Sequence, residues 1–211
     1  MLFCLEFNMA RASLRGMSLV ELIVAMGILS IVMLGMSTFL ASVWRTQSFT
    51  MQTGQDSFAA SRGVEGMVDL IRNAQTGADG SFPVAQATAT EFSFFADENH
   101  DGIIERVHLF YDTSTTPKTI KYGVTNPSTT TPPTYPASDD SVSVVATSVV
   151  NDGSEPVFSY YDRTNAALSA TPTLADVRMV HVSILVDATP LAGSHAVEIS
   201  SFASLRNLWR K

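Results

Sequence analysis

Hydrophobic residues form one uninterrupted stretch near the N-terminus, and alternate with polar residues through much of the remaining chain. Residues 22–44 carry no formal charge. As a helix they would be about 34 Å long, enough to cross the hydrocarbon core of a bilayer. Arg11 and Arg15 precede the stretch and Arg45 follows it, so the basic residues weakly favour a cytoplasmic N-terminus. The pattern predicts a membrane-spanning helix over residues 17–44.

After residue 44 the chain becomes polar without a helix-breaking signal, and apolar residues recur at an irregular helical spacing. They are Phe49, Phe58, Val64, Met67, Val68 and Ile71. We expect the helix to continue to about Ala74 and to be ended by Gly77 and Gly80. Three glycines inside this stretch would each cost up to about 1 kcal/mol and suggest a bend. Begun at Met17, the helix would be about 87 Å long, so its second half must pack on a soluble domain.

The rest of the chain shows the two-residue alternation of β-strands, separated by turn-forming residues. The expected strands cover residues 90–96, 104–112, 119–124, 142–150, 157–161, 177–186 and 195–203. Residues 125–140 are rich in proline, threonine and serine, and predict a solvated surface loop that is either mobile or a contact arm. Because no internal repeat interrupts this pattern, we predict one α+β head in which the long helix packs on a mostly antiparallel sheet.

Composition excludes several classes of function. The formal charge is −7, from 13 basic and 20 acidic residues without a basic cluster, so nucleic-acid binding is not expected. The only cysteine is Cys4. Nucleotide-binding loops, a serine-nucleophile elbow and histidines at metal-ligand spacing are all lacking. Asp139 and Asp140 lie in the predicted loop, where we expect solvation rather than acid–base catalysis. We therefore expect no enzyme and no required cofactor.

A single carboxylate, Glu21, stands just inside the edge of the apolar helix. Placing a carboxylate in hydrocarbon costs roughly 2.5–3.5 kcal/mol, and less near the edge, so such a residue normally has a partner or a task. Cleavage between Gly16 and Met17 would turn Met17 into a new N-terminus. Its ammonium group could then neutralise Glu21, within one subunit or between stacked subunits.

The residues GMSLVE, from Gly16 to Glu21, followed by an apolar helix, resemble the class III signal of type IV pilins and type II secretion pseudopilins. The resemblance implies that prepilin peptidase cuts after Gly16, that Met17 becomes N-methylated, and that Glu21 guides assembly. The family's main subunits usually have phenylalanine at the position of Met17, whereas minor subunits vary more. Translation from Met9 instead of Met1 would give a shorter, wholly basic leader.

This resemblance divides the chain into three parts. Residues 1–16 would be a leader peptide that is removed, and residues 17–44 a transmembrane and assembly helix. Residues 45–211 would be the amphipathic half of the helix together with an extracytoplasmic, β-rich globular head.

The segment DENHDGIIE, residues 97–105, begins like a Ca²⁺ loop, with side-chain oxygens at alternate positions followed by a glycine. The twelfth position is His108 instead of a bidentate glutamate, and strands are expected on both sides, which excludes a helix-loop-helix EF-hand. Two interpretations remain, an isolated Ca²⁺ hairpin and an Asx-rich turn without a metal. The candidate ligands are Asp97, Asn99, Asp101, the carbonyl of Ile103, and Glu105.

Features of the C-terminal half are similar to the larger minor subunits of the family, the J type of type II secretion or the W type of type IV pili. They are the hairpin of residues 97–105, the strand FSYY followed by Asp162, and a last strand ending in LRNL at residues 205–208. The implied function is a minor pilin or pseudopilin that helps initiate or cap a filament. The sequence does not choose between secretion, pilus and competence machines.

The minor-subunit hypothesis implies a set of partners and a location. The partners are prepilin peptidase, other minor and major subunits, the inner-membrane assembly platform, and membrane lipid before assembly. The protein would cross the bacterial cytoplasmic membrane once with its head outside, and then join a filament in the periplasm or at the cell surface. The alternative is an uncleaved, membrane-anchored extracytoplasmic binding or sensor protein.

Overall fold

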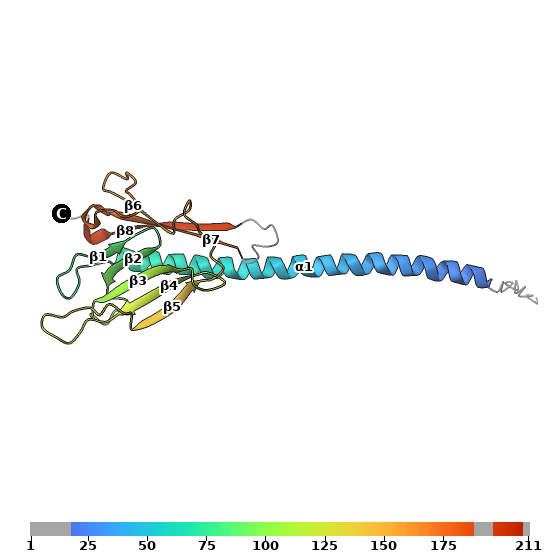
Figure 1. The fold of residues 1–211 in the computed structure, drawn as a ribbon, viewed down its shortest axis with the longest axis horizontal. Coiled ribbons are helices and arrows are strands. Elements are labelled where there is room, and N and C mark those ends of the chain that lie inside the picture. The colour runs from blue at the N-terminus through green and yellow to red at the C-terminus, as the bar shows by residue number, and fades with distance from the viewer. Residues whose placement is uncertain (1–17, 188–195, 209–211) are drawn as a thin grey trace, which may run out of the picture. The chain divides into compact units, whose positions relative to one another are not determined.

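The computed structural model describes residues 18–187 and 196–208 (Figure 1). A long helix, α1 (Leu19–Arg72), comes first and antiparallel strands follow, which confirms the predicted α+β, pilin-like architecture. The chain divides into two units between Gln47 and Ser48, so α1 contributes its first half to one unit and its second half to the other.

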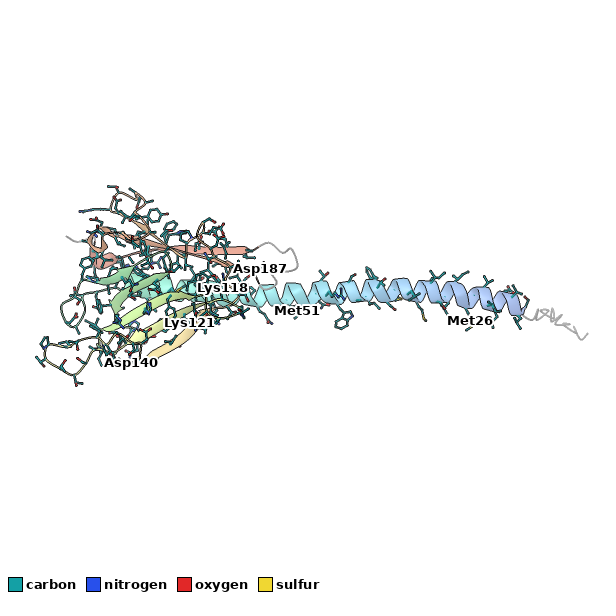
Figure 2. All side chains as sticks on the ribbon, viewed as in Figure 1. Met26, Met51, Lys118, Lys121, Asp140 and Asp187 are labelled. Atoms are coloured by element: carbon teal, nitrogen blue, oxygen red, sulfur yellow. The ribbon has the colours of Figure 1, made fainter. Side chains whose placement is uncertain are left out.

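In the first unit, the segment Leu19–Gln47 of α1 is long and apolar enough to cross a membrane, and none of it is buried inside the protein. Side chains project from all sides of this part of the helix (Figure 2). Five hydroxyl groups interrupt its apolar surface, and each donates a hydrogen bond to a backbone carbonyl three or four residues earlier. They belong to Ser30, Ser37, Thr38, Ser42 and Thr46. Such internal bonds keep polar groups satisfied where no water is present.

In the second unit, one face of α1 lies in the hydrophobic core. The predicted apolar positions Val64, Met67, Val68 and Ile71 are all buried there, together with Ala60. The expectation for Phe58 is wrong, because its side chain is 77% exposed. The side chain of Phe49 lies outside the described residues.

The helix ends at Arg72, two residues before the predicted end. The N–H groups of Asn73 and Ala74 bond to carbonyls only three residues back, which tightens the last turn. The N–H of Gln75 then donates to the carbonyl of Phe95, 2.8 Å away, so the chain leaves the helix to join a strand before Gly77 is reached.

The strands form two antiparallel sheets, each of which follows the order of the chain (Figure 1). The five-stranded sheet contains β1 (Val84–Ala87), β2 (Glu91–Ala96), β3 (Glu105–Asp112), β4 (Thr119–Thr125) and β5 (Ser141–Ala146). The three-stranded sheet contains β6 (Phe158–Tyr161), β7 (Met179–Val186) and β8 (Val197–Ser204). The short 3₁₀ helix η1 (Leu174–Asp176) precedes β7, and η3 (Arg206–Leu208) follows β8.

The predicted strands differ from the observed ones mainly at the edge of the larger sheet. Strand β1 was missed, because it has only four residues and a register shift between Val84 and Gln86 breaks its alternation. The strand predicted over residues 142–150 ends at Ala146, and Val149 makes only an isolated bridge to Val186. Residue 195, the predicted start of the last strand, lies outside the described residues.

Residues from both sheets and from α1 share a single core, which includes a group of aromatic side chains. The ring of Phe92 is 5.3 Å from that of Phe94, 6.2 Å from that of Phe158 and 5.7 Å from that of Tyr160. The hydroxyl of Tyr160 donates to the carbonyl of Thr88 at 2.7 Å, so its burial leaves no unpaired polar atom.

The glycine at position 63 allows α1 to approach the end of β5 closely. A Cβ atom at Gly63 would lie 2.5 Å from Cγ1 and 2.9 Å from the carbonyl oxygen of Val145. Helical structure continues through all three glycines of this stretch. At Gly63, therefore, the missing side chain provides room for a strand and does not interrupt the helix.

Candidate functional site

The first candidate site is the start of α1. Glu21 lies in the first helical turn, where a carboxylate interacts favourably with the positive end of the helix dipole. Its backbone N–H donates to the hydroxyl oxygen of Ser18 at 3.4 Å, and its side chain is exposed. Gly16 and Met17, the predicted cleavage and methylation positions, lie outside the described residues.

The second candidate site is the hairpin that connects β2 to β3. The carboxylate of Asp97 accepts hydrogen bonds from the backbone N–H groups of Asp101 and Gly102, at 3.1 and 3.0 Å. The side-chain oxygen of Asn99 accepts from Asp101 at 2.9 Å, and that of Asp101 accepts from Ile103 at 2.7 Å. All three polar side chains are thus held by the turn that they help to form.

Two residues of this turn have left-handed backbone conformations. His100 has a φ of 63° and Gly102 a φ of 87°. Such angles favour glycine, and they bend the chain sharply between the ends of the two strands. The strands on both sides of the turn are those that the sequence predicted.

Glu105, the first residue of β3, is the buried acid of this hairpin, with only 1% of its surface exposed. One carboxylate oxygen, Oε2, accepts a hydrogen bond from the N–H of Glu98 at 3.0 Å. The other, Oε1, is buried without a hydrogen-bond partner. Burial raises the pKa of Glu105, and the negative charges of Asp101 and Asp97 act in the same direction.

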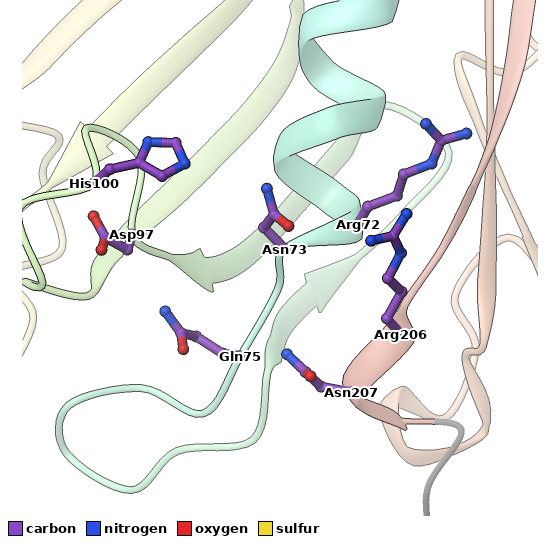
Figure 3. Close-up of a pocket in the computed structure, with 7 residues that line it drawn as sticks. All are labelled: Arg72, Asn73, Gln75, Asp97, His100, Arg206 and Asn207. Atoms are coloured by element: carbon purple, nitrogen blue, oxygen red, sulfur yellow. The ribbon is translucent and has the colours of Figure 1, made fainter.

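Beside the hairpin lies an open cleft between the end of α1, the β2–β3 hairpin and the C-terminal turn (Figure 3). Its lining residues are Arg72, Asn73, Gln75, Asp97, His100, Arg206 and Asn207. Figure 3 shows the two arginine side chains on one side of the cleft, and Asp97 with His100 on the other. One lining residue already has a structural partner, because the side chain of Asn207 donates a hydrogen bond to the carbonyl of Ala74 at 2.8 Å.

A third polar cluster was missed by the sequence analysis. Asp139, expected to be solvated, has a side chain that is only 11% exposed. Its carboxylate lies 3.6 Å from the guanidinium of Arg106 and 3.1 Å from Nδ1 of His108, and it accepts a hydrogen bond from the hydroxyl of Thr125 at 3.1 Å. The carboxylate occupies the space that a side chain at Gly123 would fill. The glycine within β4 was the signal that could have revealed this packing.

The loop that carries Asp139 is attached to the head at several points. The hydroxyl of Tyr135 donates to the carbonyl of Ile104 at 2.6 Å and accepts from the N–H of Ala78 at 3.0 Å. Its ring lies 4.8 Å from the ring of Phe95. The loop is therefore folded back onto the five-stranded sheet, despite its proline-rich and threonine-rich composition.

No cluster of three or more His, Cys, Asp or Glu side chains is ready to hold a metal ion within residues 18–187 and 196–208. The carboxylates of Asp97 and Asp101 instead accept hydrogen bonds from backbone N–H groups, and one oxygen of Glu105 has no partner. Acid–base or nucleophilic chemistry finds no support in these contacts, because each cluster consists of turn or ion-pair interactions.

Residues 11–37 match the family model described as the prokaryotic N-terminal methylation motif. The match covers the predicted cleavage position, the predicted methylated residue and Glu21, and supports a type IV pilin-like family for this chain. The J-type or W-type resemblance stays a prediction. No curated protein and no solved structure matched the chain.

Proposed function

We propose, with the type IV pilin-like N-terminus as premise, that this protein is a minor subunit that helps to initiate or cap a type IV pilus or a type II secretion pseudopilus. The observation that carries the proposal is the methylation motif at residues 11–37, which overlaps the start of an exposed apolar helix. Its role is structural, and it acts by binding to partner subunits.

The apolar first half of α1 is surrounded first by lipid and then by protein. Before assembly, lipid covers the segment Leu19–Gln47, and the protein is a single-pass anchor with its head outside the cytoplasm. In the filament, the helices of other pilin subunits replace the lipid. Gly27 and Gly35 have open space where a Cβ atom would lie, so neighbouring helices can approach closely there.

Processing prepares the subunit for this transfer. Prepilin peptidase cuts after Gly16 and methylates the new amine of Met17, and the assembly platform then delivers the subunit to the filament. Glu21 attracts the positively charged N-terminus of a neighbouring subunit. Because Glu21 is exposed and lies in the first turn of α1, it is accessible to that neighbour.

A minor role is supported by the absence of cysteine after Cys4. The chain cannot form the C-terminal disulfide that is found in many main pilins of Gram-negative bacteria, and its head is larger than theirs usually are. Quantitative mass spectrometry of purified filaments tests this part of the proposal. A copy number far below that of the main subunit is expected, and a comparable copy number would identify a main subunit instead.

Intact-mass and N-terminal peptide analysis of the protein from its native membrane is the decisive experiment. A chain that starts at N-methylated Met17 is expected. A chain that retains residues 1–16 would contradict processing and would favour the membrane-anchored binding or sensor protein. Glu21→Ala provides the assembly test, with Glu65→Ala, a substitution of an exposed carboxylate in the second half of α1, as control.

Incorporation of the two variants into filaments should differ. Glu21→Ala is expected to reduce incorporation severely while the head stays folded, since Glu21 belongs to the other unit of the chain. Glu65→Ala should be incorporated normally. Wild-type incorporation of Glu21→Ala would remove the proposed role of this carboxylate.

A further inference from the structure

We propose that the cleft at the end of α1 binds a peptide segment of another protein, whose carboxylate pairs with Arg72 and Arg206 and whose positively charged group pairs with Asp97. The cleft has a volume of about 320 Å³, and all the residues that line it belong to the second unit of the chain. This inference goes beyond the filament role and does not depend on it, because it concerns only the chemistry that the cleft recognises.

Two guanidinium groups form one wall of the cleft (Figure 3). Arg72 is the last residue of α1, and Arg206 is the first residue of η3. Two positive charges on one wall repel each other, and a carboxylate bound between them relieves that repulsion. A guanidinium also presents its N–H donors in a rigid fork that fits both oxygens of a carboxylate. This wall is therefore suited to bind a carboxylate.

Both guanidinium groups are available to a ligand. Arg206 is exposed, and it forms no ion pair within residues 18–187 and 196–208. Arg72 pairs with Asp69 at 3.2 Å, but the side chain of Asp69 is 73% exposed, so water screens this pair. Another terminal nitrogen of Arg72 makes a long bond of 3.4 Å to the carbonyl of Phe202. A carboxylate from a ligand can therefore replace weak contacts of Arg72 and give Arg206 a partner.

The carbonyl groups at the C-terminal end of α1 do not prevent an anion from binding here. Unpaired carbonyls at a helix end carry partial negative charge and would repel it. The carbonyls of Leu70 and Ile71 accept N–H groups three residues further along the chain. The carbonyl of Ala74 accepts the side-chain N–H of Asn207 at 2.8 Å. These partners reduce the negative potential that the last turn presents to the cleft.

The opposite wall restricts the kind of anion. Asp97 lies there together with His100 (Figure 3). The carboxylate of Asp97 is held by two backbone N–H groups, at 3.1 and 3.0 Å, and its remaining lone pairs can accept further bonds. Its negative charge disfavours a compact dianion such as phosphate in the same cleft. A ligand with a carboxylate at one end and a positively charged group at the other satisfies both walls.

Amide side chains complete the lining of the cleft. Asn73, Gln75 and Asn207 each have donor and acceptor atoms of the kind that pair with peptide bonds. Within the described part of the chain, no hydrophobic side chain lines the cleft, whereas sites for small molecules are mostly apolar. In an extended peptide, residues two positions apart point to the same side. An acidic and a basic residue at this spacing can therefore face the cleft together.

An NMR titration of the full chain in detergent, with ¹⁵N-labelled arginine, tests the proposal. The Nε–H signals of Arg72 and Arg206 are assigned from the signal that disappears in Arg72→Lys and in Arg206→Lys. The probe is the peptide acetyl-Glu-Gly-Lys-amide. Saturable shifts of both signals are expected, with a Kd of about 10⁻³ M. The peptide with glutamine in place of glutamate should bind about tenfold more weakly or worse, because it lacks the carboxylate.

Two results of this titration would overturn the proposal. The first is the absence of saturable shifts at about 10 mM peptide, or equal binding of the glutamate and glutamine peptides. The second concerns inorganic phosphate, which should bind about tenfold more weakly than the peptide because Asp97 repels it. Phosphate binding as tight as that of the peptide would identify a general anion site instead of a peptide site.

Substitutions locate the site and separate binding from folding. Arg206→Gln removes one positive charge and should weaken peptide binding about tenfold or more, as read from the signal of Arg72. Arg206→Lys keeps the charge without the fork, so the loss should be smaller. Arg62→Gln, which removes an exposed arginine of α1 outside the cleft, is the matched control and should bind the peptide like the wild type.

Thermal unfolding followed by circular dichroism checks that each variant is folded. Because Arg206 and Arg62 are both exposed, their substitution should leave the melting temperature unchanged. A loss of binding in Arg206→Gln at an unchanged melting temperature then reports on the ligand contact alone. Equal peptide binding by Arg206→Gln and Arg62→Gln would contradict the assignment of the site to this cleft.

Discussion

Replacing Asp139 by asparagine should destabilise the head, whereas the same change at the adjacent Asp140 should not. Asp139 is 11% exposed, and its carboxylate contacts Arg106, His108 and Thr125. Asp140 is exposed, and its carboxylate accepts a hydrogen bond from the backbone N–H of Asn126 at 2.8 Å. The side-chain oxygen of an asparagine could accept the same bond. The two neighbouring aspartates thus form a matched pair that differs mainly in burial and in charged partners.

The size of the effect follows from this burial. Removing one partner of a fully buried ion pair costs about 3–5 kcal/mol, because the remaining charge is left uncompensated. The side chains of Arg106 and His108 are 18% and 24% exposed, so water partly screens both. We therefore expect Asp139→Asn to lower the free energy of unfolding by about 2–3 kcal/mol, and Asp140→Asn to change it by less than about 0.5 kcal/mol.

The assay is thermal and denaturant-induced unfolding of the full chain in detergent, followed by far-UV circular dichroism. For a chain of this size, the expected loss corresponds to a melting temperature lowered by about 5–10 °C in Asp139→Asn. Equal melting temperatures for the two variants would refute the reasoning, because they would show that the Asp139 cluster is no more important than a solvated carboxylate.

Two further predictions concern the helix and the pH dependence of stability. Gly63→Ala should lower the free energy of unfolding by about 1–3 kcal/mol despite the better helix propensity of alanine, because its methyl group would meet Val145. Gly66→Ala, which has open space at its Cβ position, should not be destabilising. Denaturant titration of both variants measures the difference. Hydrogen bonds from Lys121 and Ser114 lower the pKa of Asp112 to about 2. The stabilisation from Asp112 is therefore complete above its unfolded value of 3.8 and lost as the pH falls towards about 2. Melting curves across this pH range should show that Asp112→Asn loses less stability in acid than the wild type does. An equal loss of stability in the variant would contradict this contribution of Asp112.

The features that follow a regular period were predictable from the sequence, and those that depend on distant partners were not. The alternation from Val180 to Val186 predicted β7 because every second side chain of the strand faces the core. The burial of Asp139 depends on Arg106 and His108, which are 33 and 31 residues away along the chain (139 − 106 and 139 − 108). No local pattern reports such a contact. Phe58 looked like a core residue by type, but its position on α1 leaves it exposed.

The two candidate sites illustrate the same difference. The start of α1 was recognisable because its signal is a short contiguous motif, and the family comparison covers that motif. The spacing of oxygen atoms in the β2–β3 hairpin was also visible in the sequence. The unpartnered oxygen of Glu105 was not, because it arises only when the β-sheet folds and buries that residue.

The five hydroxyl groups in the first half of α1 have a consequence for the proposed passage of the helix from lipid into a filament. Each of the five already bonds to a carbonyl of its own helix, so none has to exchange a partner when lipid is replaced by protein. These hydroxyl groups therefore add no hydrogen-bond barrier to the proposed extraction of the helix. Under this proposal, the direction of transfer depends on how well the apolar surfaces of neighbouring helices fit together, and on the charged side chain of Glu21 at the helix start.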